Sequence, residues 1–207
     1  METSNPTSCE IVFVLGPPGS GKGTLCKAAA GLAGQYRSRI LHLSVGDYLR
    51  ELCNSETSSD TGYFDTAKIR DYLKESKLLP ANVLIPVLKH KIESTPNWNA
   101  RDVVWLVDGF PRNMETTRVF EDKIGKPGKV IVLECSRGVA QGRFLSRARE
   151  KADDERRFDK RYAEYVDNMK ALREHYASVI SIVHVDASPK ECRDAFIATF
   201  FRKGDKV

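Results

Sequence analysis

The sequence predicts an α/β fold in which helices cover both faces of a doubly wound parallel sheet. Five short, continuous runs rich in Val, Ile and Leu are typical of strands that are buried on both faces. These runs cover residues 11–15, 40–43, 103–107, 129–134 and 182–186. Stretches with helical patterns alternate with them, at residues 22–32, 65–75, 81–93, 137–150 and 154–179. Because alternating strands and helices form right-handed βαβ crossovers, we expect one doubly wound sheet.

Length and charge limit the classes of protein to consider. With 207 residues, 41% of them hydrophobic, the chain is long enough for one well-packed domain. The net charge of +5 comes from scattered arginines and lysines rather than from one basic tail. We therefore expect a small anionic substrate and no nucleic acid partner. No apolar run reaches the length that crosses a bilayer, and the first ten residues lack the layout of a secretory signal. We expect a cytoplasmic protein with no membrane partner.

The five cysteines are odd in number and scattered, and none forms a Cys-x-x-Cys pair. This pattern argues against a disulfide framework and against a zinc site, and it suits a reducing compartment. We expect all five to be ordinary buried or surface thiols.

The first predicted strand leads into a glycine-rich loop, Gly-Pro-Pro-Gly-Ser-Gly-Lys-Gly-Thr, at residues 16–24. Glycines allow such a loop to curl until its backbone N–H groups point inward, and the next helix adds its positive N-terminal end. Lys22 can then reach the outer phosphates of a nucleoside triphosphate. The general pattern places Ser or Thr directly after the lysine, whereas here Gly23 comes first and Thr24 follows.

Charged residues follow two other predicted strands. The run 103–107 ends in Asp108, which is expected to face a Mg²⁺ ion through water or, alternatively, only to form a turn with Gly109. Arg112 comes one short turn later, and its planar fork can hold a phosphate with two hydrogen bonds. After the second strand, a small-residue turn and a helix start are expected before Arg50. Two such arginines beside a phosphate loop predict a second phosphate-bearing ligand.

His42, at the end of the second strand, is a possible general base. A single histidine in this position is more often structural, and phosphoryl transfer depends on positioning and charge neutralisation more than on a base. We therefore expect His42 to have a structural role.

Residues 16–24, 42–50 and 107–112 together resemble the nucleoside monophosphate kinases, the adenylate and UMP-CMP kinase family, over nearly the whole chain. The resemblance implies a phosphate-loop fold with a five-stranded core, an inserted monophosphate-binding lobe at about 47–76 and a short lid at about 146–154. It also implies transfer of the γ-phosphoryl group of ATP to a nucleoside monophosphate with Mg²⁺ as cofactor, and a monomer. ATP and a nucleoside monophosphate are the expected partners.

The resemblance also implies roles for individual residues. The catalytic residues would be Lys22, Arg112, Arg147 and Arg161. ATP would be bound by Gly16, Pro18, Gly19, Ser20, Gly21, Lys22, Gly23, Thr24 and Arg143. The monophosphate would be bound by Gly46, Arg50, Leu79, Gly109, Arg112 and Thr116, and a metal through water by Asp108. Arg156, Arg157 and Lys160 are expected to be solvated charges.

The lid segment departs from the family pattern. The usual glycine-containing loop that ends in Gly-Arg is absent, so Arg149 or Lys151 must take the place of that arginine. A lysine lacks the two-pronged geometry of arginine, which leaves open which of the two residues completes the lid.

The acceptor base is open between two groups. Adenylate kinases carry a threonine where Val45 stands, and a glutamine where Thr116 stands; UMP-CMP kinases have an asparagine at the latter position. The loss of both adenylate-type groups favours UMP or CMP, with AMP as the alternative. A phosphate-loop hydrolase or a nucleotide-binding scaffold is more remote, because a signalling hydrolase has no need of Arg50 and Arg112 and the Asn-Lys-x-Asp guanine motif is absent.

Overall fold

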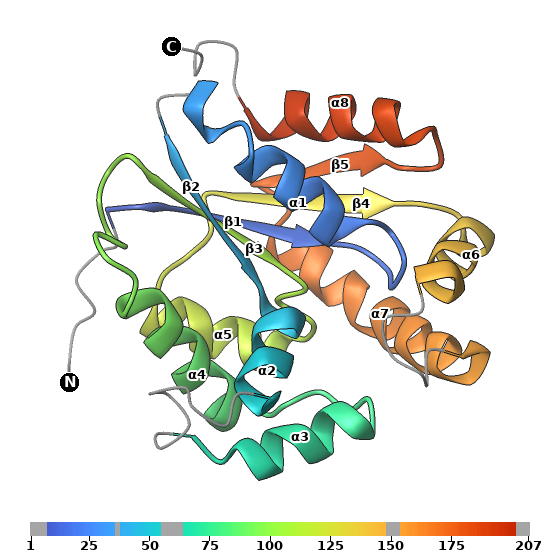
Figure 1. Ribbon diagram of the computed structural model, residues 1–207, viewed down its shortest axis with the longest axis horizontal. Helices are drawn as coiled ribbons and strands as arrows, with labels where there is room; N and C mark the ends of the chain where they lie inside the picture. The colour runs from blue at the N-terminus through green and yellow to red at the C-terminus, as the bar shows by residue number, and fades with distance from the viewer. Residues whose placement is uncertain (1–7, 36–37, 55–63, 148–153, 202–207) are drawn as a thin grey trace.

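A computed structural model describes residues 8–35, 38–54, 64–147 and 154–201, and Figure 1 shows their arrangement. At the centre lies a parallel sheet of five strands in the order β2-β3-β1-β4-β5. The strands are β1 (Glu10–Leu15), β2 (Arg39–Ser44), β3 (Val103–Asp108), β4 (Lys129–Glu134) and β5 (Ile180–His184). This topology confirms the predicted α/β fold with a doubly wound, five-stranded parallel sheet.

Helices pack on both faces of the sheet. The described helices are α1 (Lys22–Ala30), the short 3-10 helix η1 (Ala33–Gln35), α2 (Val45–Asn54), α3 (Thr66–Lys74), α4 (Ala81–Glu93), α5 (Met114–Lys123), α6 (Arg137–Arg147), α7 (Glu155–His175) and α8 (Pro189–Phe200). Helices α1 and α8 cover one face, and α4, α5 and α7 cover the other (Figure 1). Helices α2 and α3 extend the layer formed by α4, α5 and α7, and they lie below the edge of the sheet in Figure 1.

Strand β1 shows why its apolar run is continuous. Successive side chains of a strand point to opposite faces, so a central strand needs apolar residues at every position. Ile11, Phe13 and Leu15 pack in the core under α4, α5 and α7. Val12 and Val14 pack in the core under α1 and α8. Phe13 is fully buried and meets the ring of Phe110 edge to face at 5.4 Å, which ties the strand to the segment that follows β3.

The strand register brings the predicted functional segments to one edge of the sheet. Asp108 pairs with Val14 of β1 and with Ser44 of β2, so the carboxyl ends of these three strands lie side by side. The glycine-rich loop, the segment after Asp108 and the start of α2 therefore leave the sheet at the same place. In open α/β sheets this edge is where ligands bind.

Several boundaries differ from the predicted ones, most clearly around the last strand. The last strand begins at Ile180 rather than at residue 182, because its register is set by pairing with β4, where Ile180 lies opposite Val130. Helix α7 accordingly ends at His175 instead of at residue 179. Helix α6 is described as far as Arg147, and the rest of the predicted helix lies outside the described residues.

Helices α5 and α8 were not predicted, although their N-termini carry clear signals. Ser188 caps α8 in a capping box with Glu191, and a proline follows at the first helical position. Asn113 caps α5 by accepting a hydrogen bond from the backbone N–H of Thr116. Among the described residues, every helix is too short or too polar to span a lipid bilayer.

Candidate active site

The loop after β1 forms an anion cradle at the N-terminus of α1. Gly21 is the N-cap of α1 with φ 88°, and no side chain caps the first turn of that helix. The free N–H groups of a helix N-terminus attract anions, and the helix dipole adds to this attraction. Gly19 also has a positive φ of 83°, and a Cβ there would lie 1.9 Å from the carbonyl oxygen of Ala140. Glycine is therefore required where α6 packs directly on the loop.

Lys22 lies folded over this cradle. Its ammonium group donates to the carbonyl oxygens of Gly16 at 2.7 Å and Pro17 at 2.8 Å, and to the hydroxyl of Ser20 at 3.2 Å. Burial lowers the pKa of Lys22 to about 7, against the opposing charge of Asp108. Three nearby arginines act in the same direction as burial: Arg112, Arg161 and Arg147. An anion bound next to Lys22 would favour the charged ammonium group and raise its pKa again.

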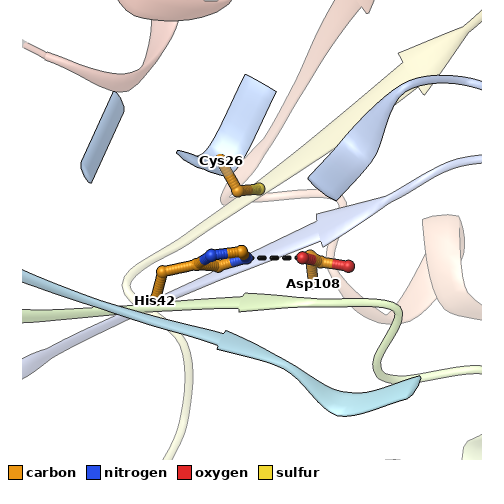
Figure 2. Close-up of side chains that lie close together, drawn as sticks. All are labelled: Cys26, His42 and Asp108. Atoms are coloured by element: carbon orange, nitrogen blue, oxygen red, sulfur yellow. Dashed lines mark hydrogen bonds and ion pairs between the residues drawn. The ribbon is translucent and has the colours of Figure 1, made fainter. Parts of the chain in front are cut away.

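Asp108 ends β3 beside the loop, with a carboxylate that is nearly buried. His42 Nε2 lies 2.5 Å from Asp108 Oδ2 (Figure 2). The Ser44 hydroxyl lies 3.5 Å from Oδ1. The long contact at Oδ1 leaves lone pairs on this oxygen for a water molecule of a hydrated cation. A hard carboxylate oxygen beside a phosphate cradle fits Mg²⁺, which is normally bound by one or two carboxylates, phosphates and several waters.

Helix α2 begins at Val45, directly after β2, and carries Gly46 and Arg50. The predicted turn between strand and helix is wrong, since the first helical residue follows the last strand residue, and Arg50 lies on the second turn of α2. The Arg50 guanidinium pairs with Asp47 Oδ1 at 2.5 Å across one turn of the helix. This ion pair is half exposed, so it orients the guanidinium more than it stabilises the fold.

The segment after β3 lies beside the glycine-rich loop and the start of α2. Gly109 has φ 74°, a cis peptide joins Phe110 to Pro111, and Arg112 Nε donates to the Gly109 carbonyl at 3.1 Å. Burial lowers the pKa of Arg112, while Glu164 opposes this effect. The hydrogen bond from Nε thus holds the guanidinium in place beside Gly109.

Thr116 is buried, and its hydroxyl donates to Asn113 Oδ1 at 2.8 Å. This hydrogen bond occupies the one donor of the hydroxyl, so Thr116 can offer a ligand only acceptor lone pairs. Sequence reasoning singled out Thr116 but missed Asn113, which caps α5 and lies in the same wall.

Three arginines of α6 and α7 border the loop from the other side. Arg143 donates to the carbonyl oxygen of Val185 at 2.8 Å, which fixes it against the segment after β5. The guanidinium carbons of Arg147 and Arg161 lie 4.5 and 5.7 Å from the ring centroid of the buried Phe144. Cations over one aromatic face are partly stabilised by its quadrupole. The lid residues 148–153, including Arg149 and Lys151, lie outside the described residues.

Two cavities adjoin at this edge of the sheet. The larger, of about 370 Å³, is lined by residues from the loop and from α6 and α7: Gly16, Pro18, Gly19, Gly21, Lys22, Gly23, Thr24, Arg143 and Arg147. The smaller is lined by Gly46, Arg50, Leu79, Asn113, Thr116 and Arg157. Gly109, Arg112 and Arg161 line both. Of the predicted loop residues, Ser20 is buried beneath the loop, where it supports Lys22 instead of lining the cavity.

The junction of the cavities is strongly positive. Burial lowers the pKa of Arg161 to about 9, and the charges of Arg112 and Arg147 act in the same direction. Like charges that gather at a half-buried position destabilise one another until an anion neutralises them. An anion with several negative charges would therefore be stabilised at the wall that the two cavities share.

Arg157 and Lys160 are not free solvated charges as the sequence suggested. Arg157 Nε donates to the Ser76 hydroxyl at 2.8 Å, and its terminal nitrogen donates to the Leu73 carbonyl at 3.2 Å. Lys160 donates to the Glu75 carbonyl at 2.5 Å. Both contacts join the start of α7 to the C-terminus of α3, where unpaired carbonyls favour cations. Because these residues are some eighty positions apart, no local sequence pattern predicts their contact. For Arg156, which is exposed, the expectation is confirmed.

These features define a phosphate-loop protein with two adjoining cavities that share a positively charged wall. The sequence profile described as adenylate kinase matches residues 14–181. The chain is 35% identical over 185 residues to the UMP-CMP kinase of Danio rerio, an alignment that covers 86% of this chain and 89% of that protein. It is 32% identical over 202 residues to the UMP-CMP kinase of Homo sapiens, with 94% and 98% covered. UMP-CMP kinase 3 of Oryza sativa is 34% identical over 181 residues, with 86% and 78% covered.

The chain belongs to the adenylate kinase family of nucleoside monophosphate kinases. This confirms the family that the three sequence motifs indicated.

Proposed function

We propose that this protein transfers the γ-phosphoryl group of Mg-ATP to UMP or CMP and releases two nucleoside diphosphates. The observation that carries the proposal is the wall shared by the two cavities, where Arg112 and Arg161 border both. A hydrolase needs one nucleotide cavity and a water, whereas two adjoining cavities allow the donor and acceptor phosphates to meet in line.

In this proposal each side chain acts on a different part of the reaction. The loop N–H groups and Lys22 hold the outer phosphates of ATP, and Arg50 and Arg112 hold the α-phosphate of the acceptor. Arg147 and Arg161 neutralise charge on the transferring group, which spreads over its equatorial oxygens in the transition state. Arg143 borders the donor base, and Leu79 borders the acceptor base. Asp108 would hold magnesium through water, and the ion would supply positive charge that neutralises the donor phosphates.

Two observations support a pyrimidine as the acceptor base. Val45 lines the smaller cavity with an apolar side chain, so the wall offers no hydrogen bond there to the polar edge of adenine. The named relatives at 32–35% identity are UMP-CMP kinases.

The test is an initial-rate assay with Mg-ATP and UMP, CMP or AMP in turn, with each diphosphate product identified. We expect kcat/KM for UMP or CMP to exceed that for AMP at least about ten-fold, which corresponds to about 1.4 kcal/mol of transition-state binding. A preference for AMP would contradict the acceptor assignment.

A reaction without any monophosphate serves as the control. ATP consumption at an equal rate in this control would instead identify a hydrolase, and nucleotide binding without turnover would identify a scaffold.

A further inference from the structure

Three side chains with metal-binding atoms meet behind the glycine-rich loop. Cys26 comes from α1, His42 from β2 and Asp108 from the end of β3, so they are distant in sequence. The Cys26 sulfur, a ring nitrogen of His42 and a carboxylate oxygen of Asp108 all lie within 4.8 Å of one another. Figure 2 shows the sulfur beside the hydrogen-bonded pair of His42 and Asp108.

We propose that Cys26, His42 and Asp108 form a site for a thiophilic divalent cation, Zn²⁺, which inhibits the enzyme by taking Asp108 away from magnesium. Thiolate, imidazole and carboxylate are the ligands that Zn²⁺ takes in proteins, and three protein ligands with one water are typical of an open zinc site. Mg²⁺ differs in this respect because it binds oxygen ligands and does not recruit a thiol.

The distances are close to those that zinc requires. Tetrahedral zinc has bonds of roughly 2.0–2.3 Å, so its ligand atoms lie roughly 3.3–3.6 Å apart. His42 Nε2 and Asp108 Oδ2 are 2.5 Å apart and would separate by about 1 Å, within the reach of small χ changes. The ion would replace the proton that now joins Nε2 to the carboxylate, and the thiol proton would leave to solvent. No oxidant or other reactant is needed.

Charge favours this ion in a buried position. Cys26 is fully buried, and His42 and Asp108 have side chains only 12% and 8% exposed. A doubly charged cation with one thiolate and one carboxylate has no net charge, so it avoids most of the cost of burying an ion. Burial and the Asp108 carboxylate raise the pKa of the Cys26 thiol, whereas the positive charge of Lys22 lowers it, so the ion must displace the thiol proton when it binds.

The absence of a Cys-x-x-Cys pair led the sequence argument to reject a zinc site. That argument covers ligands close together in the chain, whereas here 66 residues separate His42 from Asp108. The proposed site arises from the sheet, which places the ends of β2 and β3 side by side next to α1.

The consequence for activity rests on the proposed function, but the binding does not. A zinc ion on Asp108 Oδ2 neutralises the carboxylate charge that Oδ1 would otherwise offer to hydrated magnesium, so the two cations oppose each other's binding. Inhibition should therefore weaken as Mg²⁺ is raised at a constant ATP concentration.

The test compares the full chain with Cys26→Ala, and uses Cys192→Ala as the matched control because Cys192 is also a buried thiol. Cobalt is the spectroscopic probe, since a thiolate bound to Co²⁺ gives a charge-transfer band in the near ultraviolet. We expect one equivalent of Co²⁺ to produce this band in the wild type and in Cys192→Ala, and Zn²⁺ to displace it. In Cys26→Ala the band should be lost, and the Zn²⁺ affinity and the potency of zinc inhibition should fall at least ten-fold.

A band that persists in Cys26→Ala, or zinc affinity equal to that of the wild type, would overturn the proposal. If Cys26→Ala fails to fold by circular dichroism, Cys26→Ser gives the same comparison with better-preserved shape. Cobalt binding at Cys26 in a protein without kinase activity would support the site and refute the proposed function. Kinase activity with no cobalt band would do the reverse.

Discussion

The donor and acceptor sides of the active site are built in different ways. The donor cradle comes mainly from one continuous segment, residues 16–24, which follows β1 and leads into α1. The acceptor cavity is assembled from α2, the end of α3, the segment after β3 and the start of α7. A continuous site depends on local backbone geometry, whereas an assembled site depends on tertiary contacts. Single substitutions on the donor side should therefore abolish most of the activity. Single substitutions on the acceptor side should reduce it by smaller factors.

The largest effect is expected for Lys22→Ala. Lys22 places its ammonium group over the anion cradle, and its loss removes charge stabilisation from the phosphoryl group that is transferred. We predict that kcat falls by about 10³-fold or more. Initial-rate kinetics at saturating ATP and acceptor will measure it. A loss confined to KM for ATP would show that Lys22 contributes only ground-state binding.

Gly19→Ala should be the most damaging change to the loop backbone. The added Cβ would lie 1.9 Å from the carbonyl oxygen of Ala140, and the alanine would have to adopt the positive φ of Gly19. Gly21→Ala is the matched control, because Gly21 has a similar φ of 88° but no atom within 4 Å of the added Cβ. The control should cost about 1–2 kcal/mol for the left-handed backbone, and Gly19→Ala should cost more. Thermal denaturation and ATP binding measure both; equal losses would mean that α6 does not restrain the loop.

On the acceptor side, Arg50→Ala is expected to raise the KM for the monophosphate about ten- to a hundred-fold. A hydrogen bond to a charged group contributes about 1.5–3 kcal/mol, and Arg50 lines only the acceptor cavity of the two. The KM for ATP should change less than about two-fold. Equal changes for both substrates would argue against the separation of donor and acceptor sides.

Arg157→Ala should have the smallest effect, a rise of a few-fold in acceptor KM with kcat nearly unchanged. The change removes two hydrogen bonds that join α7 to Ser76 and to the end of α3, but no group assigned to the phosphates. Arg156→Ala is the control, since the neighbouring side chain is exposed. If both variants behave alike, the contact between α7 and α3 does not shape the acceptor site.

The same contrast explains what the sequence could predict. The strands and the helix Ala81–Glu93 were predicted well because their apolar patterns match burial on the faces of the sheet. The loop was predictable because Gly16, Gly19 and Gly21, which all adopt a positive φ, lie within a few residues of Lys22. The end of α7 was misplaced because β5 takes its register from β4, which is a long-range constraint.

Tertiary contacts account for what was missed at the site. Arg157 reaches Ser76 across 81 positions, and His42 reaches Asp108 across 66, so neither pair leaves a signal in the local sequence. The commitment of the Thr116 hydroxyl to Asn113 is local, and the capping role of Asn113 could have been recognised from its place before a helix. The residues assigned to phosphates do lie around the two cavities, although their roles remain predictions.

The central claim is that one cleft holds two nucleotides with their phosphates in line. Calorimetric titration with a dinucleotide in which five phosphates join adenosine to uridine tests this claim most directly. We predict that one equivalent binds, that ATP and UMP each compete with it, and that it binds at least ten-fold more tightly than its diadenosine counterpart. Binding of two equivalents, or displacement by ATP but not by UMP, would contradict the account.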